Sequence, residues 1–261
     1  MNNTVIDLSL GQMGLSYIFV LVAMAISSLN GLNKNKEILI STIRMTVQLL
    51  IAGLVLVYIF DSESFIFAGA MILFMQASAV YNIVSPRKDK LPKSIIPLIA
   101  LAMAAGSLIS LAFFLIVVVR PEPIYNPQYM IPIGGMIMGN SMNGISLALN
   151  HLLNQVDSRS DFIEGSLMLG ASPKDAMKEI SRTAFGVAIT PNINSMKNMG
   201  LITLPGMMTG QILGGVMPIV AIKYQIAIMT AIVSAVTLSV FIFLNFAYKH
   251  FFNDKAQLVD L

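Results

Sequence analysis

The segment Asp161–Ile180, with the sequence DFIEGSLMLGASPKDAMKEI, is polar, favours helix and contains Gly170 near its middle. Long apolar stretches precede and follow it along the chain. A short amphipathic helix in such a position can insert its apolar residues into a cleft of a partner protein, with charges holding its two ends. The segment is therefore interpreted as a docking element, not as a catalytic one.

The composition places the chain in a lipid bilayer. Of its 261 residues, 56% are hydrophobic and only 11% are charged, and the mean hydropathy is +0.78, whereas soluble domains carry about 25% charged residues. Zero cysteines exclude disulfides, thiolate metal sites and thiol catalysis. We expect an all-α polytopic membrane protein in which residues 1–261 form a single transmembrane domain.

Apolar runs bounded by polar or proline-containing breaks predict seven transmembrane helices, at residues 10–29, 38–60, 65–84, 95–119, 130–153, 199–216 and 219–246. The sixth run lies between Pro205 and Pro218 and is rich in glycine, so a broken or re-entrant helix is open as an alternative. The longest polar segment, residues 154–191, then connects spans five and six.

Basic residues are distributed unequally between the loops of this seven-span model. One side holds most of them: Lys34, Lys36, Arg87, Lys88, Lys90, Lys93, Arg159, Lys174, Lys178, Arg182, Lys197, Lys249 and Lys255. The other side holds Arg120 and Lys223. The positive-inside rule therefore predicts a multi-pass protein of the cytoplasmic (inner or plasma) membrane, with the N-terminus outside and the C-terminus and segment 154–191 in the cytoplasm. The net charge of +3 follows from this bias and indicates no nucleic-acid partner.

Two short helices are predicted within the cytoplasmic segment. The first begins near Ser160 and stops at Gly170, because glycine commonly follows the last turn of a helix. The second restarts with Ser172 as N-cap, Pro173 as first helical residue and Asp175 in the first turn. We expect a helix, a glycine break and a second helix.

This segment resembles the EAA loop of ABC-transporter membrane subunits, which forms the coupling helix that docks on the ATPase. The resemblance rests on Glu164-Gly165-Ser166, on Gly170-Ala171-Ser172 and on Ile180 ten residues after the glycine. Arg182 and Thr183 stand where the family has Leu-Pro, which leaves the local geometry after Ile180 open. The resemblance implies that an ATPase-coupling surface is formed by Phe162, Glu164, Gly170, Ala171 and Ser172.

Three further blocks resemble the iron-export ABC permease family, which includes bacterial iron exporters and plant aluminium-sensitivity permeases. They are MIPIGGMIMGNSM at residues 130–142, GLITLPGMMTG at 200–210 and AIKYQI at 221–226. The resemblance covers nearly the whole chain and implies a permease subunit that forms a homodimer, exports iron or another metal ion, and recruits a separate ATP-binding subunit. The chain contains no G-x-x-x-x-G-K-[ST] motif. We therefore expect no enzyme activity and no bound cofactor in this chain, with ATP and Mg²⁺ used by the partner.

Candidate residues for a transport path are the polar or sulfur-containing side chains within spans two and five, namely Arg44, Gln48, Met138, Asn140, Met142 and Asn143. Each has a simpler alternative. Arg44 can snorkel to the interface, the asparagines can hydrogen-bond between helices, and methionine commonly fills irregular apolar packing. The residues themselves indicate no metal site, so iron enters only through the resemblance.

Glycines at four-residue spacing predict close contacts between helices. Gly135 and Gly139 form one small-x-x-x-small pattern, and Gly206, Gly210 and Gly214 form another. Such patterns let the backbones of two transmembrane helices approach closely. These glycines are therefore predicted to be helix-packing positions.

The sequence also bears on functions other than that of a metal-exporting ABC permease. An ABC permease for a non-metal small solute fits the same loop, and the EAA-like loop resembles importers more than exporters, so the direction of transport stays open. A stand-alone secondary transporter lacks support from charged relays or inverted repeats in the spans. An intramembrane enzyme is disfavoured because neither G-x-S-x-G nor H-E-x-x-H occurs.

Overall fold

The computed structural model describes residues 7–62, 64–89, 91–253 and 255–258, which form helices and turns with two isolated bridges. The chain divides into two compact units. Unit one contains residues 1–63 with 213–215, and unit two contains residues 64–212 with 216–261. The expectation of an all-helical protein is met in both.

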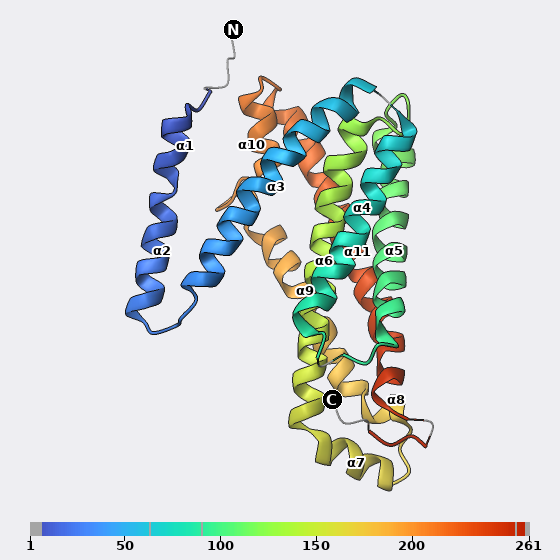
Figure 1. Ribbon diagram of the computed structural model, residues 1–261. Coiled ribbons are helices and arrows are strands. Elements are labelled where there is room, and N and C mark those ends of the chain that lie inside the picture. Colours follow the sequence, from blue (N-terminus) through green and yellow to red (C-terminus); the bar gives the residue numbers. More distant parts are fainter. Residues whose placement is uncertain (1–6, 63, 90, 254, 259–261) are drawn as a thin grey trace. The chain divides into compact units, whose positions relative to one another are not determined.

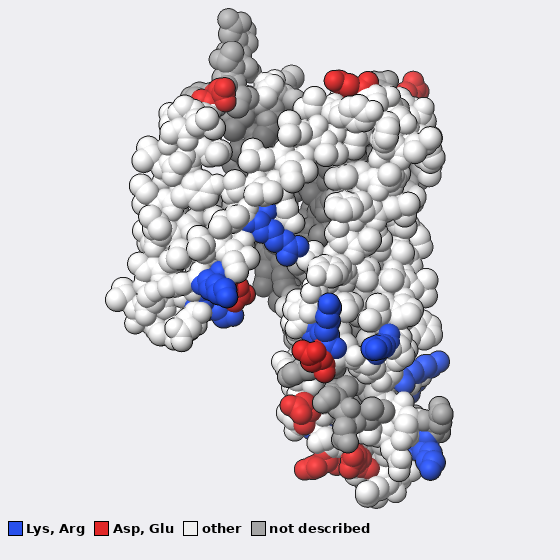
Figure 2. Space-filling model, viewed as in Figure 1, with Lys and Arg blue, Asp and Glu red and all other residues white. Residues whose placement is uncertain are grey.

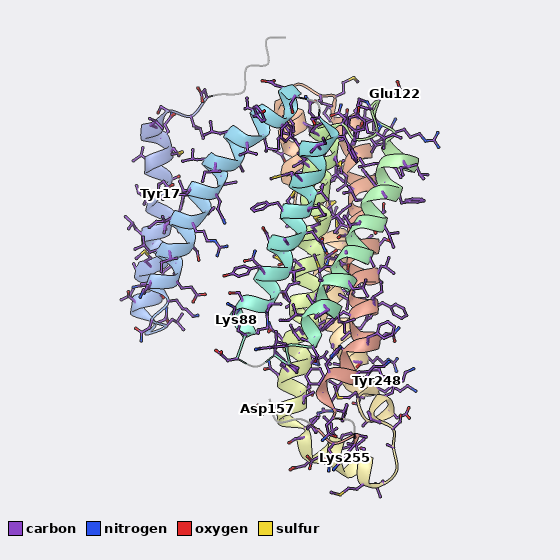
Figure 3. The ribbon with its side chains drawn as sticks, turned by 45° about the vertical axis from the view of Figure 1, so that its right-hand side comes forward. Tyr17, Lys88, Glu122, Asp157, Tyr248 and Lys255 are labelled. Atoms are coloured by element: carbon purple, nitrogen blue, oxygen red, sulfur yellow. The ribbon has the colours of Figure 1, made fainter. Side chains whose placement is uncertain are left out.

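Unit one is built from α1 (Leu10–Ser16), α2 (Ile18–Leu29) and α3 (Asn35–Ser62). A capping box between Ser9 and Gln12 starts α1, and α2 follows it almost directly. The hydroxyl groups of Tyr17 and Thr46 lie 2.7 Å apart and join the α1–α2 junction to α3 (Figures 1 and 3). The first two predicted spans therefore coincide with helical segments.

Four of the long helical segments described in unit two form a bundle. They are α4 (Phe65–Val84), which continues into η1 (Ser85–Arg87), α5 (Ile95–Phe113), which continues into the π-helix η2 (Phe114–Val119), α6 (Pro127–Ser158), and α11 (Pro218–Ala247), which continues into η3 (Tyr248–Phe251). Helix α6 packs against α4, α5 and α11, so it lies at the centre of the unit (Figure 1).

Five helical segments in the described residues are long and apolar enough to cross a membrane: 10–29, 35–62, 65–87, 95–119 and 218–251. The protein is therefore an all-α, multi-pass membrane protein. Helix α6 has 32 residues, about 48 Å in length, but its asparagine, glutamine and histidine residues make it less apolar than these five. Composition alone therefore does not reproduce the seven-span count.

The structure differs most from prediction at the sixth span, Met199–Val216. Its only helix is α10 (Gly206–Leu213), whose eight residues extend about 12 Å, far less than the ~30 Å hydrocarbon core. Pro205 precedes this helix, and Gly215 follows it with a φ of +93°. The structure of residues 199–216 therefore agrees with a broken helix and not with a continuous membrane-spanning helix.

Helix α9 (Lys178–Asn198), and not the run Met199–Val216, carries the chain back from the end of α6 toward the start of α11. This helix packs against both α6 and α11. Its buried residues, Ile180, Ala184, Ala188 and Asn192, recur every four positions and form one stripe. Much of α9 lies in the segment predicted as a loop, because the helix is too polar for a hydropathy search to detect.

The glycines at close helix contacts in unit two are mostly not the ones that the sequence predicted. A Cβ on Gly106 would lie 2.7 Å from the backbone nitrogen of Ser239, which joins α5 closely to α11. A Cβ on Gly144 would lie 2.7 Å from Val236 Cγ1. Of the predicted positions, Gly135 would meet Met75 at 2.8 Å, whereas Gly139, Gly206 and Gly210 face open space within 4 Å.

Candidate functional site

The predicted coupling surface lies at one end of unit two, where α7 (Ser160–Met168) and α8 (Pro173–Ala176) follow α6. Figure 3 places Lys88, Asp157 and Tyr248 toward this end of the unit and Glu122 at the opposite end. Lys, Arg, Asp and Glu side chains gather at this end of the unit, while the surface between the two ends is largely uncharged (Figure 2). A charged end next to an uncharged belt is the distribution expected where a membrane protein enters water.

Helix α7 ends in a Schellman motif centred on Gly170. The backbone N–H of Gly170 donates to the carbonyl of Leu167 at 2.9 Å, and that of Ala171 donates to the carbonyl of Ser166 at 3.0 Å. This geometry requires a left-handed residue, and Gly170 has a φ of +92°. The predicted glycine stop is therefore confirmed, with a specific conformational reason.

Helix α8 begins as its sequence predicts. Ser172 is the N-cap, its hydroxyl accepts from the backbone N–H of Asp175 at 3.2 Å, and Pro173 is the first helical residue. The hydroxyl of Ser172 also donates to the carboxylate of Asp175 at 2.5 Å. The end of α7 and the start of α8 are therefore determined locally, by Gly170 after the first helix and by Ser172 and Pro173 at the start of the second.

The side chains of α7 divide into an anchoring set and an exposed set. Ile163 is fully buried against unit two, and Leu167 packs partly against the same core. Phe162 is 59% exposed, and the two residues at the end of the helix, Met168 and Leu169, are 85% and 91% exposed. An exposed apolar tip on an anchored helix can bind a complementary cleft.

The coupling residues inferred from the resemblance all lie on this short segment. Phe162 and Glu164 are exposed on α7, Gly170 and Ser172 form the two caps, and Ala171 between them is half-buried. Sequence reasoning did not single out Met168 and Leu169 for this surface. Their position directly before Gly170 could have indicated this role, because the last side chains of a helix are often exposed at its end.

Polar contacts connect this end of unit two across helices. The guanidinium of Arg87, in η1, donates from Nε to the carboxamide oxygen of Asn150 on α6 and from Nη1 to the carbonyl of Ile83, both at 2.5 Å. Arg159, directly before α7, lies 3.8 Å from Glu179 on α9, with both side chains largely exposed. The first contact ties α4 to α6, whereas the second is exposed enough to contribute little to stability.

The candidate path residues occupy different environments. Arg44 and Gln48 are exposed on α3 in unit one. On α6 in unit two, Met138 is only 2% exposed and belongs to the core, and Met142 packs partly against that core. The buried position of Met138 fits the packing alternative better than a path.

The two asparagines of α6 also differ from each other. Asn140 is half-buried, and its amide donates to the carbonyl of Met136 at 2.8 Å, within the same helix. Asn143, one turn further, is exposed. Neither side chain makes a hydrogen bond to another helix among the described residues, and the path and packing roles of the two asparagines stay predictions.

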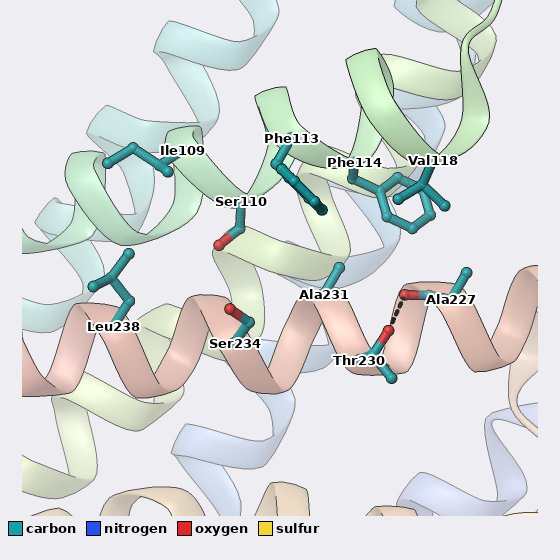
Figure 4. Close-up of a pocket in the computed structure, with 10 residues that line it drawn as sticks. All are labelled: Ile109, Ser110, Phe113, Phe114, Val118, Ala227, Thr230, Ala231, Ser234 and Leu238. Carbon is teal, nitrogen blue, oxygen red and sulfur yellow. Dashed lines mark hydrogen bonds between the residues drawn. The ribbon is translucent and has the colours of Figure 1, made fainter.

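Two of the hollows in unit two, among others of similar size, differ in character. One, of about 450 Å³, lies between the α5–η2 segment and α11 and is mainly apolar, with the hydroxyl of Thr230 turned to the carbonyl of Ala227 at 2.8 Å (Figure 4). The other, of about 470 Å³, lies beside α8 and includes Lys174, Lys178 and Tyr248. Among the described residues, no group of three or more His, Asp or Glu side chains converges as a metal site.

Comparison with known proteins identifies relatives over almost the full length. Residues 10–252 match the model of the family described as "Uncharacterised protein family (UPF0014)". The "Probable iron export permease protein FetB" of Escherichia coli K12 is 36% identical, over 95% of this chain and 94% of its own. The "UPF0014 membrane protein slr1647" of Synechocystis is 34% identical, over 99% and 100%.

A plant protein shows a similar likeness. The "Protein ALUMINUM SENSITIVE 3" of Arabidopsis thaliana is 33% identical, over 92% of this chain and 86% of its own. No solved structure matches the chain. The family match and these near full-length relatives together lead to one conclusion: the chain belongs to the UPF0014 family of membrane proteins, together with the bacterial and plant relatives to which its sequence blocks were likened.

Proposed function

We propose that this chain is the membrane-spanning permease subunit of an ATP-driven ABC transporter that exports iron or another metal ion. The observation that carries the proposal is the segment α7–Gly170–α8, an anchored helix that ends in an exposed apolar tip at the charged end of unit two. The printed name of the Escherichia coli relative, which covers 95% of this chain, supports the class of cargo.

In this proposal, two copies of the chain form a homodimer, and each α7 inserts Phe162 and the Met168–Leu169 tip into a separate ATP-binding subunit. A Cβ added to Gly206 or to Gly210 would meet no neighbouring heavy atom within 4 Å, so this exposed glycine face is available for close contact between copies. ATP and Mg²⁺ belong to the ATP-binding partner, and lipid surrounds the apolar belt.

We further propose seven crossings in which α9, rather than Met199–Val216, is the sixth. The odd number keeps the N-terminus outside and the C-terminus in the cytoplasm of the cytoplasmic membrane, in agreement with the distribution of Lys and Arg except for Lys197, which moves to the outer end of α9. The single transmembrane domain then comprises both compact units, and α7 and α8 are its cytoplasmic coupling helices.

The proposal is tested by reconstituting the permease with its candidate ATP-binding subunit in liposomes. ATPase activity is measured without metal and with Fe(II), Mn(II) or Cu(I). Stimulation by one ion identifies the cargo and supports a coupled pair. A stable complex whose ATPase responds to none of these ions argues for a non-metal solute.

Two further outcomes separate the remaining possibilities. Failure of any ATP-binding subunit to co-purify with the chain, together with transport that needs no ATP, would point to a stand-alone secondary transporter. In inverted membrane vesicles, ATP-dependent uptake into the lumen corresponds to export from the cell. Uptake only in right-side-out vesicles would establish import instead.

A further inference from the structure

Helix α9 extends along the apolar helix α11 for the thickness of a membrane. Near its beginning, Lys178 lines a hollow together with Leu244 of α11. Directly after its end, the sulfur of Met199 lies 3.8 Å from the amide nitrogen of Gln225. Gln225 and Leu244 are about 29 Å apart along α11, close to the ~30 Å of a hydrocarbon core.

The middle of α9 lies at the middle of this span. A Cβ on Gly144, halfway along α6, would lie 2.7 Å from Val236 of α11 and 3.9 Å from the carbonyl oxygen of Ala188. The residues of α9 that follow Ala188 therefore occupy the half of the unit nearer to Gln225. At that depth, polar side chains that face lipid raise the free energy of the protein.

The part of α9 beyond Ala188 nevertheless presents an exposed polar face. Thr190, Asn194, Ser195 and Lys197 are all exposed. The hydroxyl of Thr190 donates to the carbonyl of Gly186 at 2.6 Å, a local bond that leaves both lone pairs of the hydroxyl oxygen free to accept. The carboxamide of Asn194 makes no hydrogen bond to any described residue, although an unpaired amide in hydrocarbon costs several kcal/mol.

The exposed surface of α5 at a similar depth is different in kind. Ile109 lies one turn beyond Gly106, the residue of α5 that contacts Ser239 of α11, and it is 59% exposed. It lines the mainly apolar hollow of Figure 4 with Phe113, which is 61% exposed. Ile109 and Phe113 suit lipid at this depth, whereas Thr190 and Asn194 do not, although α9 also exposes the apolar residues Ile193 and Met196 in the same stretch.

From this contrast we infer that the Thr190–Asn194–Lys197 face of α9 lines a water-filled path through the membrane domain. The polar groups are then satisfied by water, as they are in other helices that border aqueous cavities in membranes. The face includes the residue before Pro191, a proline that weakens the helical hydrogen-bond ladder and leaves a carbonyl available near the path. The path belongs to a helix that hydropathy does not detect.

The chemistry of this face suits a hydrated polar solute. The hydroxyl of Thr190 and the carboxamide of Asn194 can each replace a water molecule around a cation or a polar compound. Lys197, toward the Gln225 end, would instead attract an anionic solute or a cation that carries anionic ligands. The identity of the solute as the transported cargo rests on the proposed function, but the presence of water does not.

The absence of native cysteine makes the test direct, because each engineered thiol is alone in the chain. Thr190→Cys and Asn194→Cys are compared with Ile109→Cys, the matched apolar control at similar depth. Glu164→Cys on α7 serves as the fully aqueous reference. Membrane vesicles are frozen and thawed with a charged, membrane-impermeant methanethiosulfonate reagent, so that both sides of the membrane meet it, and the modified fraction is followed by mass.

We expect Thr190→Cys and Asn194→Cys to react at least about tenfold faster than Ile109→Cys, because the reactive thiolate forms readily in water and scarcely in hydrocarbon. Equal, slow reaction at all three positions would overturn the inference and show that lipid or protein covers this face of α9. Labelling needs neither an ATPase nor a metal ion. A missing ATPase response would therefore leave this result intact, and slow labelling would leave the ATPase coupling untouched.

Discussion

Gly106 of α5 lies so close to Ser239 of α11 that a Cβ on the glycine would fall 1.9 Å from the serine hydroxyl oxygen and 2.8 Å from its Cα. The contact involves backbone as well as side chain, so a rotamer change of Ser239 cannot relieve it. It joins two of the segments that are apolar enough to cross the membrane. The crossing of α5 and α11 therefore depends on the absence of a side chain at position 106.

Gly106→Ala is expected to lower the stability of unit two by about 2 kcal/mol, the typical cost of inserting a methyl group into a tightly packed contact. The unfolding temperature of the purified protein in detergent measures the effect. Gly69→Ala on α4 is the control, because a Cβ there meets nothing within 4 Å, and its unfolding temperature should be unchanged or slightly higher. Equal effects of the two substitutions would contradict the packing argument.

Gly170→Ala is expected to impair coupling to the ATPase while leaving the rest of the fold intact. The φ of +92° at this position is strained for any L-residue, at about 1–3 kcal/mol, so the exit of α7 should change direction. The matched control is Gly165→Ala, inside the same helix and without a neighbour within 4 Å. The ATPase activity of the reconstituted pair should fall with the first substitution and be retained with the second.

The neighbouring residues Phe162 and Ile163 should respond in opposite ways. Phe162→Asp changes a side chain that is 59% exposed, so the unfolding temperature should hold while the affinity for the ATP-binding subunit falls by at least about tenfold. Ile163→Ala removes a fully buried side chain and should cost about 2–4 kcal/mol of stability. Pull-down with the ATP-binding subunit and thermal unfolding measure the two effects, and unchanged binding by Phe162→Asp would exclude Phe162 from the interface.

Ser172→Ala should loosen α8 through the loss of its N-cap, at about 1 kcal/mol. Ser172→Asp retains an oxygen that can accept from the backbone N–H of Asp175, which the native serine does at 3.2 Å. Hydrogen exchange of the backbone amides of Asp175 and Ala176 is the measurement. Faster exchange in the alanine variant than in the aspartate variant is expected, and identical exchange would show that the cap contributes nothing.

Local sequence signals predicted the break between α7 and α8 correctly because their causes are local. A left-handed glycine at position 170 and a capping serine before Pro173 act through their own backbone and the next few residues. Long apolar runs likewise predicted the helices of unit one and α4, α5 and α11, because burial of about 20 apolar residues in lipid needs no tertiary partner. The coupling roles inferred from the resemblance remain predictions.

The sequence by itself determined that this protein is helical, lies in a membrane and carries a capped helix pair at one charged end, since each property follows from composition or from neighbouring residues. Only the tertiary structure decided that α9 lies against α6 and α11, that Met138 belongs to the core and that Gly106 is a point of closest contact. Helix α9 is polar, and its place depends on Ala184 and Ala188 fitting against helices far away in the chain. Such fits depend on which surfaces meet, and no local pattern encodes that.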